Sequence, residues 1–174
     1  MKKTILAALF FSAISGFSQR HLKGTFGVGA EGGLTKFGYY AGPSVDYNLT
    51  SKLYLKGDLL GEFGTIKLTQ TQIQLRSYYV DVSCYYNLFK LKDRMYFNGG
   101  LGVQGQYAFL KDENKGVGSF TQNIPGIGFY VSPEIEYFIS DKFVAMLNYR
   151  QAYYVKNSFG KNVAFYGAGL KYNL

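Results

Sequence analysis

The sequence has one cysteine, one histidine and three prolines among its 174 residues. The lone Cys84 cannot form an internal disulfide, so no covalent framework holds the chain. It lies between Val82 and Tyr86 on an apolar face, which is typical of a buried or lipid-facing thiol rather than a reactive one. With His21 as the only histidine, no Ser-His or Cys-His pair can form within the body of the domain, which argues against nucleophilic catalysis of that kind.

Long apolar runs are also lacking. The only candidate is N-terminal, where Lys2 and Lys3 precede the mostly apolar segment Ile5–Ile14. This run is about 10 residues, short of the roughly 20 that a membrane-spanning helix needs. Together with two small residues before a cleavage point, it predicts a secretory signal peptide over residues 1–18, with an uncleaved anchor as the alternative. Residues 19–174 then form one domain, and an exported chain without an apolar helix can span a membrane only as a closed barrel.

The composition agrees with a barrel. The chain has 22 Gly, 17 Tyr and 15 Phe, and its mean hydropathy is −0.08. Strands that alternate lipid-facing apolar residues with lumenal polar ones average to such a neutral value. The formal net charge of +8 does not gather into a basic patch with interleaved aromatic residues, so no direct nucleic-acid partner is expected. Basic rims instead suit outer-membrane lipid as a partner.

Eight segments alternate apolar and polar residues, and each is long enough to cross an outer membrane as a tilted strand. The sequence therefore predicts an all-β fold, an eight-stranded antiparallel up-and-down transmembrane β-barrel in the cell outer membrane. The predicted strands are Thr25–Leu34, Tyr40–Leu49, Leu53–Phe63, Gln74–Leu88, Met95–Phe109, Ile127–Ile139, Phe143–Val155 and Asn162–Leu174.

A repeated tripeptide indicates where the strands leave the membrane. Tyr-Asn-Leu occurs at Tyr47-Asn48-Leu49, Tyr86-Asn87-Leu88 and Tyr172-Asn173-Leu174. In each copy an aromatic and an aliphatic residue share one face, as expected at a lipid–water boundary. The first two copies lead into short basic turns, which predicts periplasmic turns. The longest and most polar connections, Gly64–Ile73 and Leu110–Gly126, are predicted to be external loops.

The charged residues predict what fills the barrel. Seven of the eleven acids lie within strands, on the phase opposite the apolar face, and three bases share that phase. Carboxylates facing lipid cost kilocalories, whereas those facing a polar lumen can be paired or hydrated. Eight strands leave room only for side chains, so a packed polar plug is predicted rather than an open pore. The predicted lumenal charge network is Glu31, Asp46, Lys56, Asp58, Glu62, Asp81, Glu134, Glu136, Arg150 and Lys171.

Motifs that resemble chemical sites have structural explanations. Gly27–Gly32 and Gly100–Gly105 both match the G-x-G-x-x-G spacing, but a dinucleotide site needs a strand before and a helix after the motif. Inside alternating strands, glycine instead makes room for bulky lumenal neighbours or lets the strand bend. Glu134 and Glu136 are two apart, as paired acids could be, yet any two lumenal residues show this spacing. No catalytic residue, cofactor or metal site is predicted.

The chain resembles the conjugative-transposon TraO-type outer-membrane proteins. The likeness covers nearly the whole predicted mature chain and is concentrated in three segments, 19–34, 137–150 and 166–174. The resemblance implies a structural role as an envelope component of a conjugation apparatus, with other proteins of that apparatus as partners. It carries no catalytic motif, so an enzyme is not expected. The alternative is a stand-alone outer-membrane barrel for surface or ligand binding, or for porin-like passage of small solutes.

Overall fold

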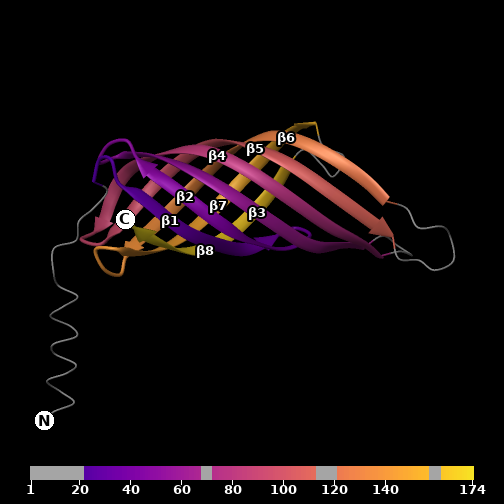
Figure 1. The fold of residues 1–174 in the computed structure, drawn as a ribbon, viewed down its shortest axis with the longest axis horizontal. Coiled ribbons are helices and arrows are strands. Elements are labelled where there is room, and N and C mark those ends of the chain that lie inside the picture. Colours follow the sequence, from indigo (N-terminus) through magenta and orange to yellow (C-terminus); the bar gives the residue numbers. More distant parts are fainter. Residues whose placement is uncertain (1–21, 68–71, 113–120, 157–161) are drawn as a thin grey trace, which may run out of the picture.

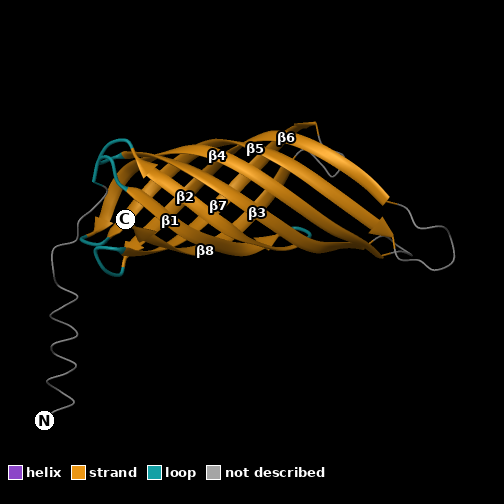
Figure 2. Ribbon diagram, viewed as in Figure 1, coloured by secondary structure: helices purple, strands orange, loops and turns teal. Residues whose placement is uncertain are grey.

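A computed structural model describes residues 22–67, 72–112, 121–156 and 162–174; the predicted signal peptide lies outside these ranges. Within them, no helix is long and apolar enough to cross a membrane. Eight strands account for almost all of the described chain (Figures 1 and 2). They are β1 (Phe26–Thr35), β2 (Gly38–Asn48), β3 (Leu53–Lys67), β4 (Gln72–Lys92), β5 (Met95–Asp112), β6 (Thr121–Phe138), β7 (Phe143–Lys156) and β8 (Asn162–Asn173).

The strands form one closed antiparallel barrel in the order β1 to β8. Each strand pairs with its neighbours in sequence, and β8 closes the barrel by pairing with β1 from Gly27↔Asn173 to Thr35↔Phe165. Closure gives every strand a hydrogen-bonded partner on both sides, as a backbone in lipid requires. The predicted fold class is confirmed.

Three short turns join β2 to β3, β4 to β5 and β6 to β7 at one end of the barrel, which we call the turn end. The first residue of β1 and the last of β8 lie at this end as well (Figure 1). The opposite end, the loop end, carries the other connections. Short turns on the periplasmic side and longer loops outside are the outer-membrane arrangement, so the turn end is periplasmic.

The strand boundaries differ from the prediction at both ends. Between Gly64 and Ile73, β3 and β4 stay paired through Lys67↔Gln72, and β5 and β6 pair through Lys111↔Thr121. The two predicted external loops are therefore shorter than expected. The sheet extends because inward-facing apolar residues continue beyond the lipid-spanning part of the strands. These residues are Leu75, Ala108, Leu110 and Ile124, which form a small buried cluster.

At the turn end, β4 runs past the predicted boundary at Leu88 to Lys92, and the reversal comes at Asp93–Arg94. Two irregularities in its pairing with β5, at Leu88 and Leu91, add residues to β4 without ending the ladder. Such bulges insert one residue and increase the local twist. The predicted strand ended at Leu88 because the strict alternation of apolar and polar residues first fails there.

Side chains alternate between the lumen and the outer wall along every strand. On β4, for example, Asp81 is 1 % exposed and its neighbour Val82 is 56 % exposed. Outward-facing aromatic pairs lie near the turn end and again nearer the loop end, as in the girdles of transmembrane barrels. Those near the turn end are Phe26–Tyr47, Phe89–Phe97 and Phe143–Tyr172; those nearer the loop end include Tyr39–Phe63, Tyr78–Phe109 and Tyr149–Tyr166.

Candidate functional site: the filled lumen

All ten residues of the predicted lumenal charge network point inward and are buried. They come from every strand except β5, and the three bases organise them into overlapping groups. The group nearest the turn end centres on Lys171 of β8. Its Nζ donates to Glu136 Oε1 of β6 at 2.5 Å and to Asp46 Oδ2 of β2 at 2.9 Å.

The second group centres on Lys56 of β3. Its Nζ donates to Glu31 Oε2 of β1 at 2.8 Å and to Glu134 Oε2 of β6 at 3.1 Å. Asp58 Oδ1 lies 3.9 Å from the same nitrogen. A buried ammonium in this position is favoured only because several carboxylates surround it and accept hydrogen bonds from it.

The third group centres on Arg150 of β7, which is 1 % exposed. One terminal nitrogen lies 2.9 Å from Asp58 Oδ2 and 3.3 Å from Glu31 Oε1, and the other contacts Asp81. The guanidinium carbon also lies 4.5 Å from the centre of the Tyr130 ring. A planar guanidinium with five donors is suited to bridging several acids at once, and it stacks on aromatic faces.

Glu62 differs from the other six lumenal acids. It accepts hydrogen bonds from the hydroxyls of Tyr79 and Thr35. Among the described residues, no Lys or Arg nitrogen lies within ion-pairing distance of it. Hydroxyl donors therefore satisfy this carboxylate in place of a base, as they can for any buried carboxylate that would otherwise lack partners.

Neutral side chains, which were not part of the predicted charge network, connect these groups. Asn98 Nδ2 donates to Glu136 Oε2 at 2.9 Å, and Tyr54 Oη donates to Glu134 Oε1 at 2.6 Å. Gln104 Nε2 donates to Asp81 Oδ2 at 3.1 Å, and Asn148 Nδ2 donates to Glu31 Oε2 at 2.9 Å. Their signal in the sequence is the same as that of the acids, because they occupy the lumenal phase of their strands.

Two glycines of β5 give the lumenal tyrosines their space. A Cβ at Gly100 would meet the Tyr85 ring, and one at Gly102 would meet the Tyr130 ring. Tyr85 is fully buried and stacks on Tyr54 with ring centroids 5.1 Å apart. The second G-x-G-x-x-G motif therefore lies inside a strand and makes room for bulky lumenal neighbours, as predicted.

Among the described residues, side chains fill the lumen. The charged and aromatic side chains that face it include Arg150, Tyr85, Tyr130 and Phe165, each at most 1 % exposed. Toward the loop end, Tyr79, Tyr154 and Phe165 form an aromatic layer, and the cluster around Leu75 lies beyond it. The described lumen is thus occupied by ion-paired charges in its middle and by apolar and aromatic side chains toward the loop end.

We next consider which described side chains could bind a metal ion or act as nucleophiles or acids. Among the described residues, no group of three or more His, Cys, Asp or Glu side chains is placed to hold a metal ion. The exposed Cys84 lies on the outer wall, away from the lumenal acids. Glu134 and Glu136, the two acids at catalytic-looking spacing, are each paired with a lumenal lysine.

A closed eight-stranded antiparallel barrel with an apolar outer wall, aromatic girdles and a filled polar lumen is an outer-membrane β-barrel. Solved structures share this fold. Neisserial surface protein A is similar with a TM-score of 0.70 and 18% identity, over 86% of this chain and 97% of that one. A major outer membrane protein from Thermus thermophilus has a TM-score of 0.67 and 12% identity, over 87% of this chain and 100% of that one.

The N-terminal β-barrel domain of Pseudomonas aeruginosa OprF is also similar, with a TM-score of 0.60 and 15% identity, over 87% of this chain and 98% of that one. At these identities the likeness concerns the fold. No known family profile matches the sequence, and no curated protein matches it.

Proposed function

We propose that this barrel is a non-enzymatic structural component of the outer membrane that serves a conjugation apparatus through its rims and loops. The observation that carries the structural part is the filled lumen. Three buried bases hold six of the seven lumenal acids in ion pairs. The lumenal side chains therefore connect the strands to one another across the barrel. What remains for contact with partners is the outside of the barrel and its two ends.

The conjugation part rests on the resemblance of segments 19–34, 137–150 and 166–174 to the TraO-type proteins. Segment 137–150 includes the last two residues of β6, the turn that follows and the first half of β7. Segment 166–174 covers most of β8, which pairs with that half of β7. On its other side, β8 pairs with the β1 part of segment 19–34. The three segments thus form one continuous part of the wall that begins at the turn end, where a periplasmic partner would have access.

The test is a clean deletion in a donor strain, with transfer frequency to a recipient as the readout. We expect transfer to fall sharply and to be restored by the wild-type gene. The deletion should leave growth and outer-membrane integrity unchanged. Unchanged transfer from a donor that carries a verified deletion would exclude the conjugation role.

A stand-alone barrel for surface or ligand binding is the second candidate. The extension of β3 to β6 beyond the rest of the wall at the loop end favours it, because that raised sheet places side chains outside the membrane (Figure 1). The filling of the described lumen by side chains argues against passage of small solutes. Binding of surface ligands to intact cells, lost on deletion while transfer is unchanged, would support this candidate.

A further inference from the structure

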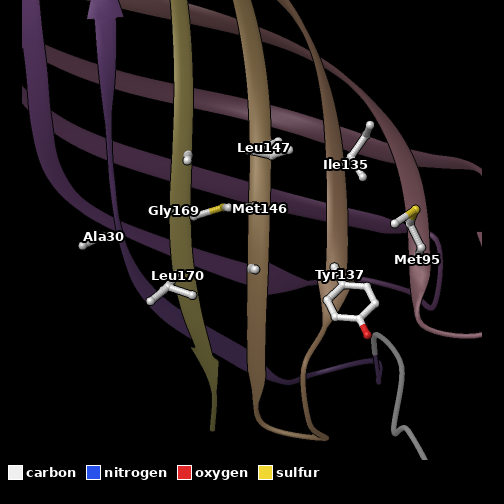
Figure 3. Close-up of a pocket in the computed structure, with 10 residues that line it drawn as sticks. Ala30, Met95, Ile135, Tyr137, Met146, Leu147, Gly169 and Leu170 are labelled. Atoms are coloured by element: carbon white, nitrogen blue, oxygen red, sulfur yellow. The ribbon is translucent and has the colours of Figure 1, made fainter.

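A groove of about 690 Å³ lies in the outer wall near the turn end (Figure 3). Its lower side follows one row of cross-strand partners from β5 to β1. Its upper side is formed by Ile135, Leu147 and Ala168, the next outward residues on β6, β7 and β8. The lower row is Met95, Tyr137, Ala145, Leu170 and Ala30.

The groove exists because small and large residues alternate on this part of the wall. Ala145 lies between the larger Tyr137 and Leu170 of the neighbouring strands, and Ala168 lies beside Leu147. Gly169, between the outward-facing Ala168 and Leu170, faces the lumen, where the Met146 side chain fills the space left by its missing side chain (Figure 3). The floor is therefore made of methyl groups and backbone, while the edges are Leu, Ile and Tyr side chains.

The groove crosses the membrane obliquely, over a depth close to one leaflet. The row crosses four strand spacings of about 4.8 Å, which gives a length of roughly 19 Å. Strands tilted by roughly 40° set such a row oblique to the membrane normal, so it rises about 12 Å through the bilayer. One leaflet contributes about half of a hydrocarbon core of roughly 30 Å. The groove therefore spans close to one leaflet, and because it begins at the turn end, that leaflet is the periplasmic one.

The end of the groove nearest the turns is polar and carries a net positive charge. Tyr137 projects its hydroxyl toward the strand ends (Figure 3). Lys142 immediately precedes β7, and its Nζ lies 5.5 Å from the centre of the Tyr172 ring on β8. Arg94 immediately precedes Met95 and donates to the Ile139 carbonyl at 3.4 Å. Asp141 offsets one of these two cations. A phosphodiester is the anion that membrane lipids present at this depth.

We infer that this groove is a binding site for an anionic phospholipid of the periplasmic leaflet, with an acyl chain on the Ala145–Ala168 floor and the phosphate near Lys142. A second copy of the chain fits less well. In a two-fold contact the same surface meets itself, so two concave floors would face each other across an unfilled space. The inference is independent of any role in conjugation.

The test uses the full barrel, purified in a neutral detergent and titrated with phosphatidylglycerol, with bound lipids counted by native mass spectrometry. The Ala145→Leu/Ala168→Leu variant fills the groove. Ala41→Leu makes the same change at a lipid-facing alanine of β2, outside the groove. Lys142→Gln removes the cation proposed to contact the phosphate. Lys52→Gln is its control and removes a cation at the exposed turn between β2 and β3. Heat-dependent gel mobility verifies that each variant is folded.

We expect wild type and both controls each to bind one phosphatidylglycerol per barrel with similar affinity. The groove-filling variant should bind phosphatidylglycerol about tenfold more weakly. Lys142→Gln should reduce the preference for phosphatidylglycerol over phosphatidylcholine. Equal lipid binding by the groove-filling variant and wild type would overturn the inference. So would a wild-type dimer that the groove-filling variant abolishes, because a second copy would then occupy the groove.

Discussion

Asp58 of β3 and Asp81 of β4 are direct cross-strand partners, and the guanidinium of Arg150 on β7 contacts both carboxylates. Like charges placed opposite each other on neighbouring strands are destabilising. The pair is tolerated because Arg150 reaches it from β7, across the lumen. This single side chain therefore links β7 to β3 and β4, strands with which β7 shares no backbone pairing.

Arg150→Met should destabilise the barrel by about 3–5 kcal/mol, because it leaves buried carboxylates without their cation. The measurement is urea unfolding of protein refolded in lipid vesicles, followed by far-ultraviolet circular dichroism. In a background that carries Asp58→Asn and Asp81→Asn, the same change should cost clearly less. An equal cost in both backgrounds would show that Arg150 acts by packing alone.

Val82→Arg should cost about 2–4 kcal/mol if the residue lies near the bilayer midplane, because it exposes a charge to lipid. Its neighbour Asp81→Asn should cost less, because the amide stays in a polar lumen and still faces Gln104. Heat-dependent gel mobility and the same urea titration report both effects. If the two variants are equally stable, the phase assigned to β4 is wrong.

Gly100→Ala should destabilise the barrel by about 1–3 kcal/mol through overpacking. The new Cβ would meet the Tyr85 ring, which cannot move aside because it is buried against Tyr54. Gly105→Ala is the matched control on the same strand, since the nearest atom to its Cβ is a backbone oxygen 3.7 Å away. Comparable losses of stability at the two sites would point to strand flexibility rather than ring packing.

Purified wild-type protein in a planar bilayer should give little or no steady conductance, because the lumenal side chains fill the cross-section. Glu134→Ala should produce brief, flickering openings, since it removes an acceptor of both Lys56 and Tyr54. Leu59→Ala on the lipid face is the control and should stay closed. Large, stable conductance steps from wild-type protein would favour a solute channel.

The alternation of apolar and polar residues in the sequence predicts much of this structure. A residue two positions along a strand returns to the same face, so Val82 and Asp81 could be assigned to lipid and lumen without coordinates. The number of strands, their order and the inward direction of the seven acids follow in the same way, because a carboxylate toward lipid is too costly. Each of these properties depends only on residues that are close together in the chain.

The pairing of the charges was decided by the tertiary structure. Arg150 meets Asp81 across 69 positions of sequence and Asp58 across 92, and Glu62 is satisfied by hydroxyls rather than by a base. These partners depend on how the closed barrel staggers its strands and on which side chains meet across the lumen. The extension of β3 to β6 at the loop end could not be predicted from the sequence for a related reason. Beyond the lipid, no hydrocarbon enforces the outward apolar phase, and the inward cluster around Leu75 forms only when strands far apart in the chain pack together.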